Sequence, residues 1–116
     1  MRRLNLTVTC LLVMSLFACE QYIIEKPEIQ EGVSFSTQIL PIFESACVSC
    51  HNGGIAPDLS AENAYEALFD GNYVDTLNAE GSEIYSKLRA GAHDSRATEE
   101  EKLLILQWIT EGALNN

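Results

Sequence analysis

Five consecutive residues, Cys47-Val48-Ser49-Cys50-His51, constrain this chain more than any other part of its sequence. The two thiols are three residues apart, which is close to one helical turn, and an imidazole follows directly. Side chains at this helical spacing lie on one face, so both sulfur atoms and the imidazole point the same way. The chain has 116 residues, which allows one small domain and no more around this motif.

The motif has the form Cys-x-x-Cys-His, which is the attachment sequence for c-type haem. Each thiol can add to one of the two vinyl groups on an edge of the porphyrin, and the histidine can then bind the iron. Thioether bonds also prevent loss of the haem, which matters in an exported protein. The motif therefore predicts one covalently attached haem c, held by Cys47 and Cys50, with His51 as the proximal ligand of the iron.

Other uses of the two cysteines compete with this interpretation. Cys47 and Cys50 could form a disulfide, as exported thiols often do. They could form a thioredoxin-like redox pair, although no β-α-β pattern surrounds the motif. They could hold zinc, but a structural zinc site needs four ligands, and only His93 and carboxylates are left to complete it.

The N-terminal residues have the pattern of an export signal. Met1-Arg2-Arg3 is a short basic start, and residues 4–17 are mostly apolar. Leu16-Phe17-Ala18 then precedes Cys19, after which the sequence becomes polar, and this order resembles a bacterial lipobox. We expect residues 1–18 to be a lipoprotein signal peptide and Cys19 to be lipidated as the new N-terminus. One alternative is an ordinary signal sequence with a coincidental cysteine. Another is an uncleaved anchor helix, although the apolar stretch is short for one.

The charge of the chain limits its partners. It has 7 Lys and Arg against 17 Asp and Glu, a net charge of −10, whereas nucleic-acid binding needs clustered basic residues. The same acidity argues against docking on an anionic lipid surface by charge, so we expect contact with a membrane through the N-terminal lipid. Cleavage before Cys19 removes both methionines, Met1 and Met14, so the mature chain has none.

The remaining sequence divides into a tether and a helical domain. Residues 19–33 are charged, contain Pro27 and Gly32 and show no sustained period, which is typical of a tether. From residue 34 to residue 116 the apolar spacing predicts an all-α domain of about four short helices. These helices are expected over residues 36–50, 61–69 and 83–90 and from residue 98 to the glycine at 112. No stretch has a convincing strand pattern.

Capping signals mark the ends of these helices. Thr98-Glu99-Glu100-Glu101 is a capping box at the start of the last helix, which has the clearest pattern. Ser60 and Ser82 are expected as the N-caps of the second and third helices. Glycines are expected to end the last three helices, at Gly71, Gly91 and Gly112. The apolar residues of the last helix predict a buried stripe of Leu104, Ile105, Trp108 and Ile109.

Two segments are similar to parts of a known family. Residues 34–43, followed by the motif and Gly53, are similar to the haem-attachment helix of class I cytochrome c-type domains. Residues 107–113, Gln-Trp-Ile-Thr-Glu-Gly-Ala, are similar to the C-terminal helix of that family. From residue 34 to residue 116 the chain thus resembles a class I cytochrome c-type domain of the small cell-envelope lipoprotein kind. The resemblance implies that the first and last helices cross near the edge of the haem.

The resemblance also implies a role for Pro57. In this family the carbonyl of a proline just after the motif often orients the histidine that binds the iron. Pro57 is the matching residue, and its carbonyl would fix the tautomer of His51 and raise the basicity of that ring. A proline that only shapes a turn is the alternative.

The chain departs from the family at the sixth iron ligand. The usual ligand is a methionine in the loop before the last helix, and the mature chain has no methionine. His93 is the only other histidine, and it lies in this loop, five residues before the Thr98 cap. A neutral imidazole binds iron strongly, so we expect His93 as the distal ligand. The alternatives are an iron with an open sixth position or a lysine ligand such as Lys87.

Together these expectations describe a monohaem c-type cytochrome that carries one electron at a time and is not an enzyme. It is expected outside the cytoplasm, anchored by lipid to a bacterial cell membrane, facing the periplasm or the cell exterior, with redox proteins as partners. One alternative is a haem sensor or a peroxidase-like protein with an open iron site. Another is a structural lipoprotein without haem, in which Cys47 and Cys50 form a disulfide.

Overall fold

The computed structural model describes residues 32–116, and these residues are all-α with no strand, as predicted. In this part of the chain the α-helices are α2 (Leu40–Ala46), α3 (Ala64–Asp70), α4 (Glu83–Leu88) and α5 (Glu99–Thr110), and none could span a membrane. Shorter helical turns are η1 (Phe35–Ile39), η2 (Ala79–Gly81) and η3 (Gly91–His93). The predicted signal peptide, the lipidated Cys19 and the predicted tether up to residue 31 lie outside the described residues.

The first predicted helix is present but ends early. It starts as the π-helical turn η1, which Ser34 caps by accepting a hydrogen bond from the N–H of Thr37, and continues directly into α2. Pro41 is tolerated there because it lies in the first turn of α2, where its missing N–H has no partner to lose. The predicted end at Cys50 is wrong. The N–H groups of Cys47 and Val48 both donate to Phe43 O, at 2.9 and 3.0 Å, and close the helix before the motif.

The second helix, α3, begins three residues later than predicted. Ser60 does not cap it; the Ser60 hydroxyl donates instead to Asp58 Oδ1 at 2.7 Å. A separate turn follows, in which the N–H of Ala64 donates to Ser60 O, and α3 starts at Ala64. Gly71 follows the last residue of the helix, as predicted.

The third helix, α4, begins at Glu83 as predicted, but Ser82 is not its side-chain cap. The buried Ser82 hydroxyl accepts from the N–H of Asp75 at 2.8 Å and donates to Asp75 O at 3.1 Å. The Ser82 side chain therefore holds the loop at Asp75 and makes no capping hydrogen bond to the first N–H groups of α4. The helix ends at Leu88, two residues before the predicted end, because Ala90 has already left the helical conformation and precedes η3.

The last helix, α5, confirms the capping box. Thr98 Oγ1 accepts from the N–H of Glu101 at 3.2 Å, and Glu101 Oε2 accepts from the N–H of Thr98 at 2.8 Å. Three of the four residues of the predicted stripe, Ile105, Trp108 and Ile109, are fully buried as predicted. The fourth, Leu104, is only half-buried. Lys102 is buried on the same helix, which the apolar pattern did not predict.

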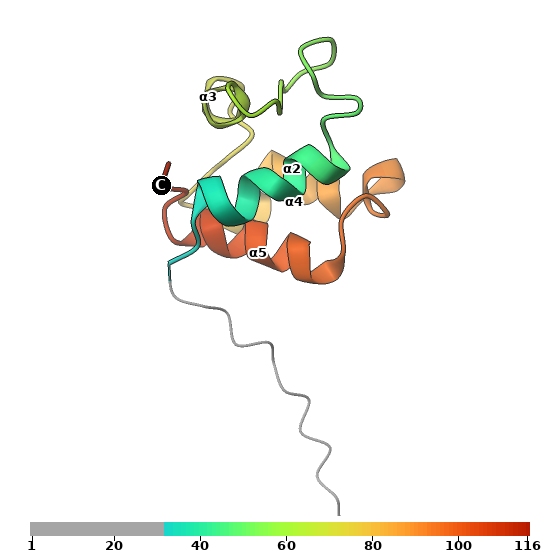
Figure 1. The fold of residues 1–116 in the computed structure, drawn as a ribbon. Coiled ribbons are helices and arrows are strands. Elements are labelled where there is room, and N and C mark those ends of the chain that lie inside the picture. Colours follow the sequence, from blue (N-terminus) through green and yellow to red (C-terminus); the bar gives the residue numbers. More distant parts are fainter. Residues whose placement is uncertain (1–31) are drawn as a thin grey trace, which may run out of the picture.

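An aromatic cluster joins the first and last helical segments. The ring centre of Phe35 lies 5.2 Å from that of Trp108 and 5.2 Å from that of Tyr65. Segment η1 contacts α5, and α5 contacts α4, so elements from both ends of the described chain are neighbours. In Figure 1, α2 lies in front of α4, and α5 runs beneath both. The core is therefore built on α5.

The last residues of the chain hold the first described residues in place. Asn116 accepts from the N–H groups of Phe35 and Ser36, at 2.8 and 2.9 Å. Glu111 accepts from the N–H of Val33 at 2.7 Å, and Val33 is 3% exposed. The packed domain therefore includes Val33, one residue before the predicted boundary.

Phe35→Ala should lower the free energy of unfolding by about 3–5 kcal/mol, because it removes a buried ring from the contact between the two ends of the chain. Denaturant titration of the folded protein measures this loss. Leu77→Ala is the control, since Leu77 is 98% exposed and its truncation should change the stability by less than about 0.5 kcal/mol. Equal effects of the two changes would contradict the assigned core.

Candidate functional site

One pocket gathers the residues that the motif analysis singled out within residues 32–116. Its volume is about 470 Å³, and its lining includes Cys47, Cys50, His51, Pro57 and His93. The first four come from the chain that follows α2, and His93 comes from η3. In Figure 1 the loop after α2 and the η3 turn lie on the same side of the molecule. Residues more than 40 positions apart in sequence thus share one cavity.

The motif forms a turn after α2. The N–H groups of Cys50 and His51 both donate to Cys47 O, at 3.1 and 3.0 Å. The motif was predicted to lie in the first helix, and it lies after the end of that helix. The turn nevertheless places both cysteines and His51 at the pocket. The sulfur atoms are free, and Cys47 is half-buried whereas Cys50 is exposed.

His51 is held by two backbone carbonyls. Its Nδ1 lies 3.1 Å from Pro57 O and 3.2 Å from Ile55 O. A carbonyl oxygen only accepts hydrogen bonds, so Nδ1 carries the proton in the neutral ring and Nε2 keeps its lone pair. This is the tautomer that binds a metal through Nε2, with the carbonyls fixing the ring. The sequence analysis named Pro57 for this contact, and the Ile55 carbonyl is an addition.

His93 faces His51 across the pocket. The two ring centres are 6.2 Å apart, and the rings are inclined at 44°. An imidazole nitrogen binds a transition metal at about 2 Å, and its ring centre lies about 1 Å further back, so two imidazoles on opposite sides of one ion have centres about 6 Å apart. The separation fits such a pair. Within residues 32–116 no three His, Cys, Asp or Glu side chains are grouped to hold a metal ion.

The rest of the lining combines apolar walls with a few charges. Phe43, Leu59, Ile84 and Leu88 are buried residues of the core whose side chains also border the cavity. Charged residues at the pocket are Glu83, Lys87 and Arg96. Lys87, considered from sequence as an alternative iron ligand, therefore does line the pocket. Arg96 was not singled out, and its place beside the cavity follows from the turns after η3.

Burial raises the pKa of the Cys47 thiol, the negative charge of Glu101 raises it further, and the positive charge of Arg96 opposes both. A low-dielectric neighbourhood disfavours the thiolate, which is the nucleophilic form of cysteine. Without a cofactor, Cys47 is therefore a protonated thiol at neutral pH.

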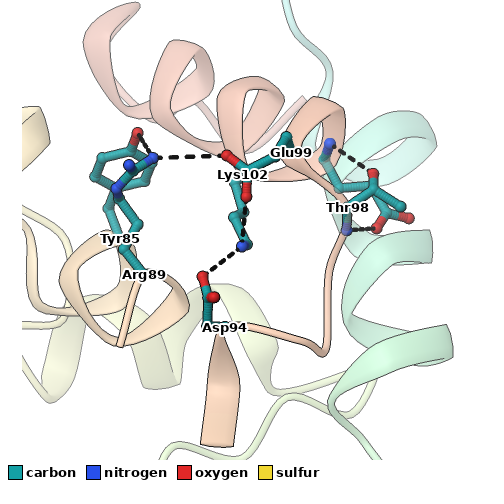
Figure 2. Close-up of polar contacts among 7 residues, drawn as sticks. Tyr85, Arg89, Asp94, Thr98, Glu99 and Lys102 are labelled. Atoms are coloured by element: carbon teal, nitrogen blue, oxygen red, sulfur yellow. Dashed lines mark hydrogen bonds and ion pairs between the residues drawn. The ribbon is translucent and has the colours of Figure 1, made fainter. Parts of the chain in front are cut away.

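A buried lysine on α5 was missed by the sequence analysis. The side chain of Lys102 is 3% exposed, and its Nζ lies 2.8 Å from Asp94 Oδ1 and 2.7 Å from Glu99 Oε1 (Figure 2). The hydrogen bond from Lys102 holds the pKa of the Asp94 carboxyl below its usual range. The signal was present, because position 102 lies three and seven residues before Ile105 and Ile109, on the buried face of α5.

Comparisons of the chain with protein-family models, with curated proteins and with solved structures find no match.

The raised pKa of Cys47 predicts a pH profile for its alkylation. In a Cys50→Ser variant without cofactor, the midpoint of the rate against pH should lie above the ordinary thiol value of 9.0. The folded state holds this proton more tightly than the unfolded state, so stability is unaffected below the ordinary pKa and falls as the pH rises above it. Alkylation with iodoacetamide in buffer and in denaturant measures both midpoints. A folded-state midpoint at or below that of the denatured chain would contradict the assigned burial.

Proposed function

We propose that the protein is a monohaem c-type cytochrome that carries single electrons in the bacterial cell envelope. The observation that carries the proposal is the shared pocket of Cys47, Cys50, His51 and His93. Its apolar walls suit the flat face of a porphyrin, and its volume of about 470 Å³ lies within the range of cofactor sites. These residues fit a haem.

Each residue has a distinct task in this proposal. Cys47 and Cys50 are the two thiols that hold the cofactor covalently, from a turn that points both into the pocket. His51 is the proximal ligand through Nε2, because its Nδ1 is engaged by the carbonyls of Ile55 and Pro57. His93 is the distal ligand. Haem bound in this way supplies an iron centre that exchanges one electron between its ferrous and ferric states.

Two imidazoles at one iron favour electron transfer over catalysis. With ligands on both sides, no position is open to oxygen or peroxide. A methionine ligand raises the reduction potential of haem, and the mature chain has no methionine, so a lower potential than that of a Met-ligated relative is expected. The protein would then donate electrons at low potential and would not act as an enzyme.

Location and partners follow from the leader and from the charge. Lipidation of Cys19 would anchor the protein to a membrane on the outside of the cytoplasm. With 17 Asp and Glu in the chain, an acidic surface suits redox proteins with a basic docking face. Nucleic acid is not a partner in this proposal.

The exposure of His93 favours one second candidate, a haem protein with an open sixth position. His93 lies on a short turn, is exposed to solvent and is not held inside a helix. If this turn moved away, the iron would be accessible to gases or peroxide, or to Lys87, which also lines the pocket. The protein would then be a sensor or would have peroxidase-like activity. The third alternative, a structural lipoprotein without haem, predicts a disulfide between the two motif cysteines.

Replacing both motif cysteines tests the covalent attachment. The double variant Cys47→Ser, Cys50→Ser should lose all haem stain on a denaturing gel, because neither thioether bond can form. The unmodified protein and Ser49→Ala, a change inside the motif that spares both thiols, should keep it. A stained double variant would contradict covalent attachment, and an unstained wild-type protein with a disulfide would support the structural alternative.

Replacing His93 tests the distal ligand. In the wild-type protein the reduced haem should not bind carbon monoxide, whereas His93→Ala should give a high-spin or water-ligated iron that binds it readily. His93→Met should restore the sixth ligand and raise the potential. Lys87→Ala is the control at another residue that lines the pocket, and it should leave the spectrum unchanged. An unchanged spectrum of His93→Ala would mean that His93 is not the ligand.

A further inference from the structure

Lys102 is the charged residue whose burial the proposed cytochrome function does not yet explain. Its side chain is 3% exposed, and a buried ammonium group is expensive unless it is paired. Both of its partners are carboxylates, Asp94 and Glu99, at 2.8 and 2.7 Å. Asp94 directly follows His93 in the sequence. The charge of Lys102 is therefore connected, through one residue, to the imidazole that faces His51.

We propose that Lys102 is a positioning residue for His93. By donating to Asp94, it ties the end of the η3 turn to α5 through one side-chain bond, so that the His93 ring stays 6.2 Å from the His51 ring. The placement of the ring is independent of any cofactor. Its consequence for the sixth iron position rests on the proposed function.

Lys102 is suited to this task because Glu99, on the same helix, holds its ammonium group in place. Glu99, one turn earlier on α5, bonds to Lys102 and lies 3.8 Å from the Arg89 guanidinium. Arg89 donates to Tyr85 Oη at 3.3 Å and lies 5.6 Å from the centre of the Tyr85 ring. Figure 2 shows this series of contacts running from Tyr85 through Arg89 and Glu99 to Lys102 and Asp94. Asp94 therefore binds a lysine that Glu99 holds on α5, and Glu99 in turn pairs with Arg89, which directly follows α4.

The turn that carries His93 has little else to define its place. Residues 91–96 are exposed, and the next residue, Ala97, is buried. The backbone hydrogen bonds of the turn are local: His93 donates to Ala90 O, Asp94 to Gly91 O and Arg96 to His93 O. Local bonds define the shape of a turn, but they do not fix where it lies on the protein. The bond from Asp94 to Lys102 supplies that second constraint.

The experiment compares the purified full-length protein with variants at both ends of this pair. Lys102→Met removes the charge but fills a similar volume, and such a replacement of a buried ion pair is often tolerated in stability. Asp94→Ala removes the partner on the turn, whereas Asp94→Glu keeps a carboxylate within reach. Ser95→Ala is the control on the same turn, at an exposed side chain.

All variants should keep the haem stain, because the thioether bonds do not involve this pair. Lys102→Met and Asp94→Ala should show a high-spin fraction and gain carbon monoxide binding, whereas Asp94→Glu and Ser95→Ala should resemble the wild-type protein and gain none. Thermal unfolding of each variant is measured in parallel, so that a general loss of stability can be told apart from a displaced His93. Wild-type spectra in both Lys102→Met and Asp94→Ala would overturn the proposal.

Amide hydrogen exchange of residues 91–97 provides a readout that does not depend on haem. It should be about tenfold faster in Lys102→Met and Asp94→Ala than in the wild-type protein, with exchange in the centre of α5 unchanged. If the wild-type protein carries no covalent haem, the proposed function fails, and exchange alone decides the role of Lys102. Unchanged exchange across residues 91–97 would then overturn it.

Discussion

The packing of Phe35 on Trp108 is the contact on which the rest of the structure depends. A domain of this size buries a small core, so one aromatic contact accounts for a large share of it. It fixes η1 on α5, and both parts of the pocket follow from these two elements. Segment η1 runs into α2 and delivers the cysteines and His51, while the residues before α5 carry His93. One apolar contact thereby sets the relation between the two histidines.

The chain separates this packing from its chemistry. The aromatic rings of Phe35, Tyr65 and Trp108 cluster where the two ends of the described chain meet, and hydrogen bonds from the last residues close that region. The imidazoles and thiols line the pocket from the turn after α2 and from the short turn η3, outside the four α-helices of the described residues. Turns allow two distant histidines to approach each other, but they need outside support, which the carbonyls provide for His51 and Lys102 for the turn of His93.

Local chemistry was predictable from the sequence, and partners distant in space were not. The all-α class and the capping box at Thr98 follow from spacing and from hydrogen bonds within a few residues. Ser60 and Ser82 were wrongly expected to cap helices, because Asp58 and Asp75 offer their hydroxyl groups other partners. The burial of Lys102 was missed, although its spacing from Ile105 and Ile109 indicated the buried face of α5, because only the folded chain brings its partner Asp94 near. That His51 and His93 share one pocket likewise depends on tertiary packing. The position of His93 in the loop before the last helix only suggested this arrangement.

The position of Val33 has a consequence for the orientation of the pocket. Val33 is pinned by Glu111 beside the C-terminal residues, and Figure 1 shows this region on the opposite side of the molecule from η3 and the loop after α2. A domain held to a surface through its N-terminal segment would therefore turn its pocket away from that surface.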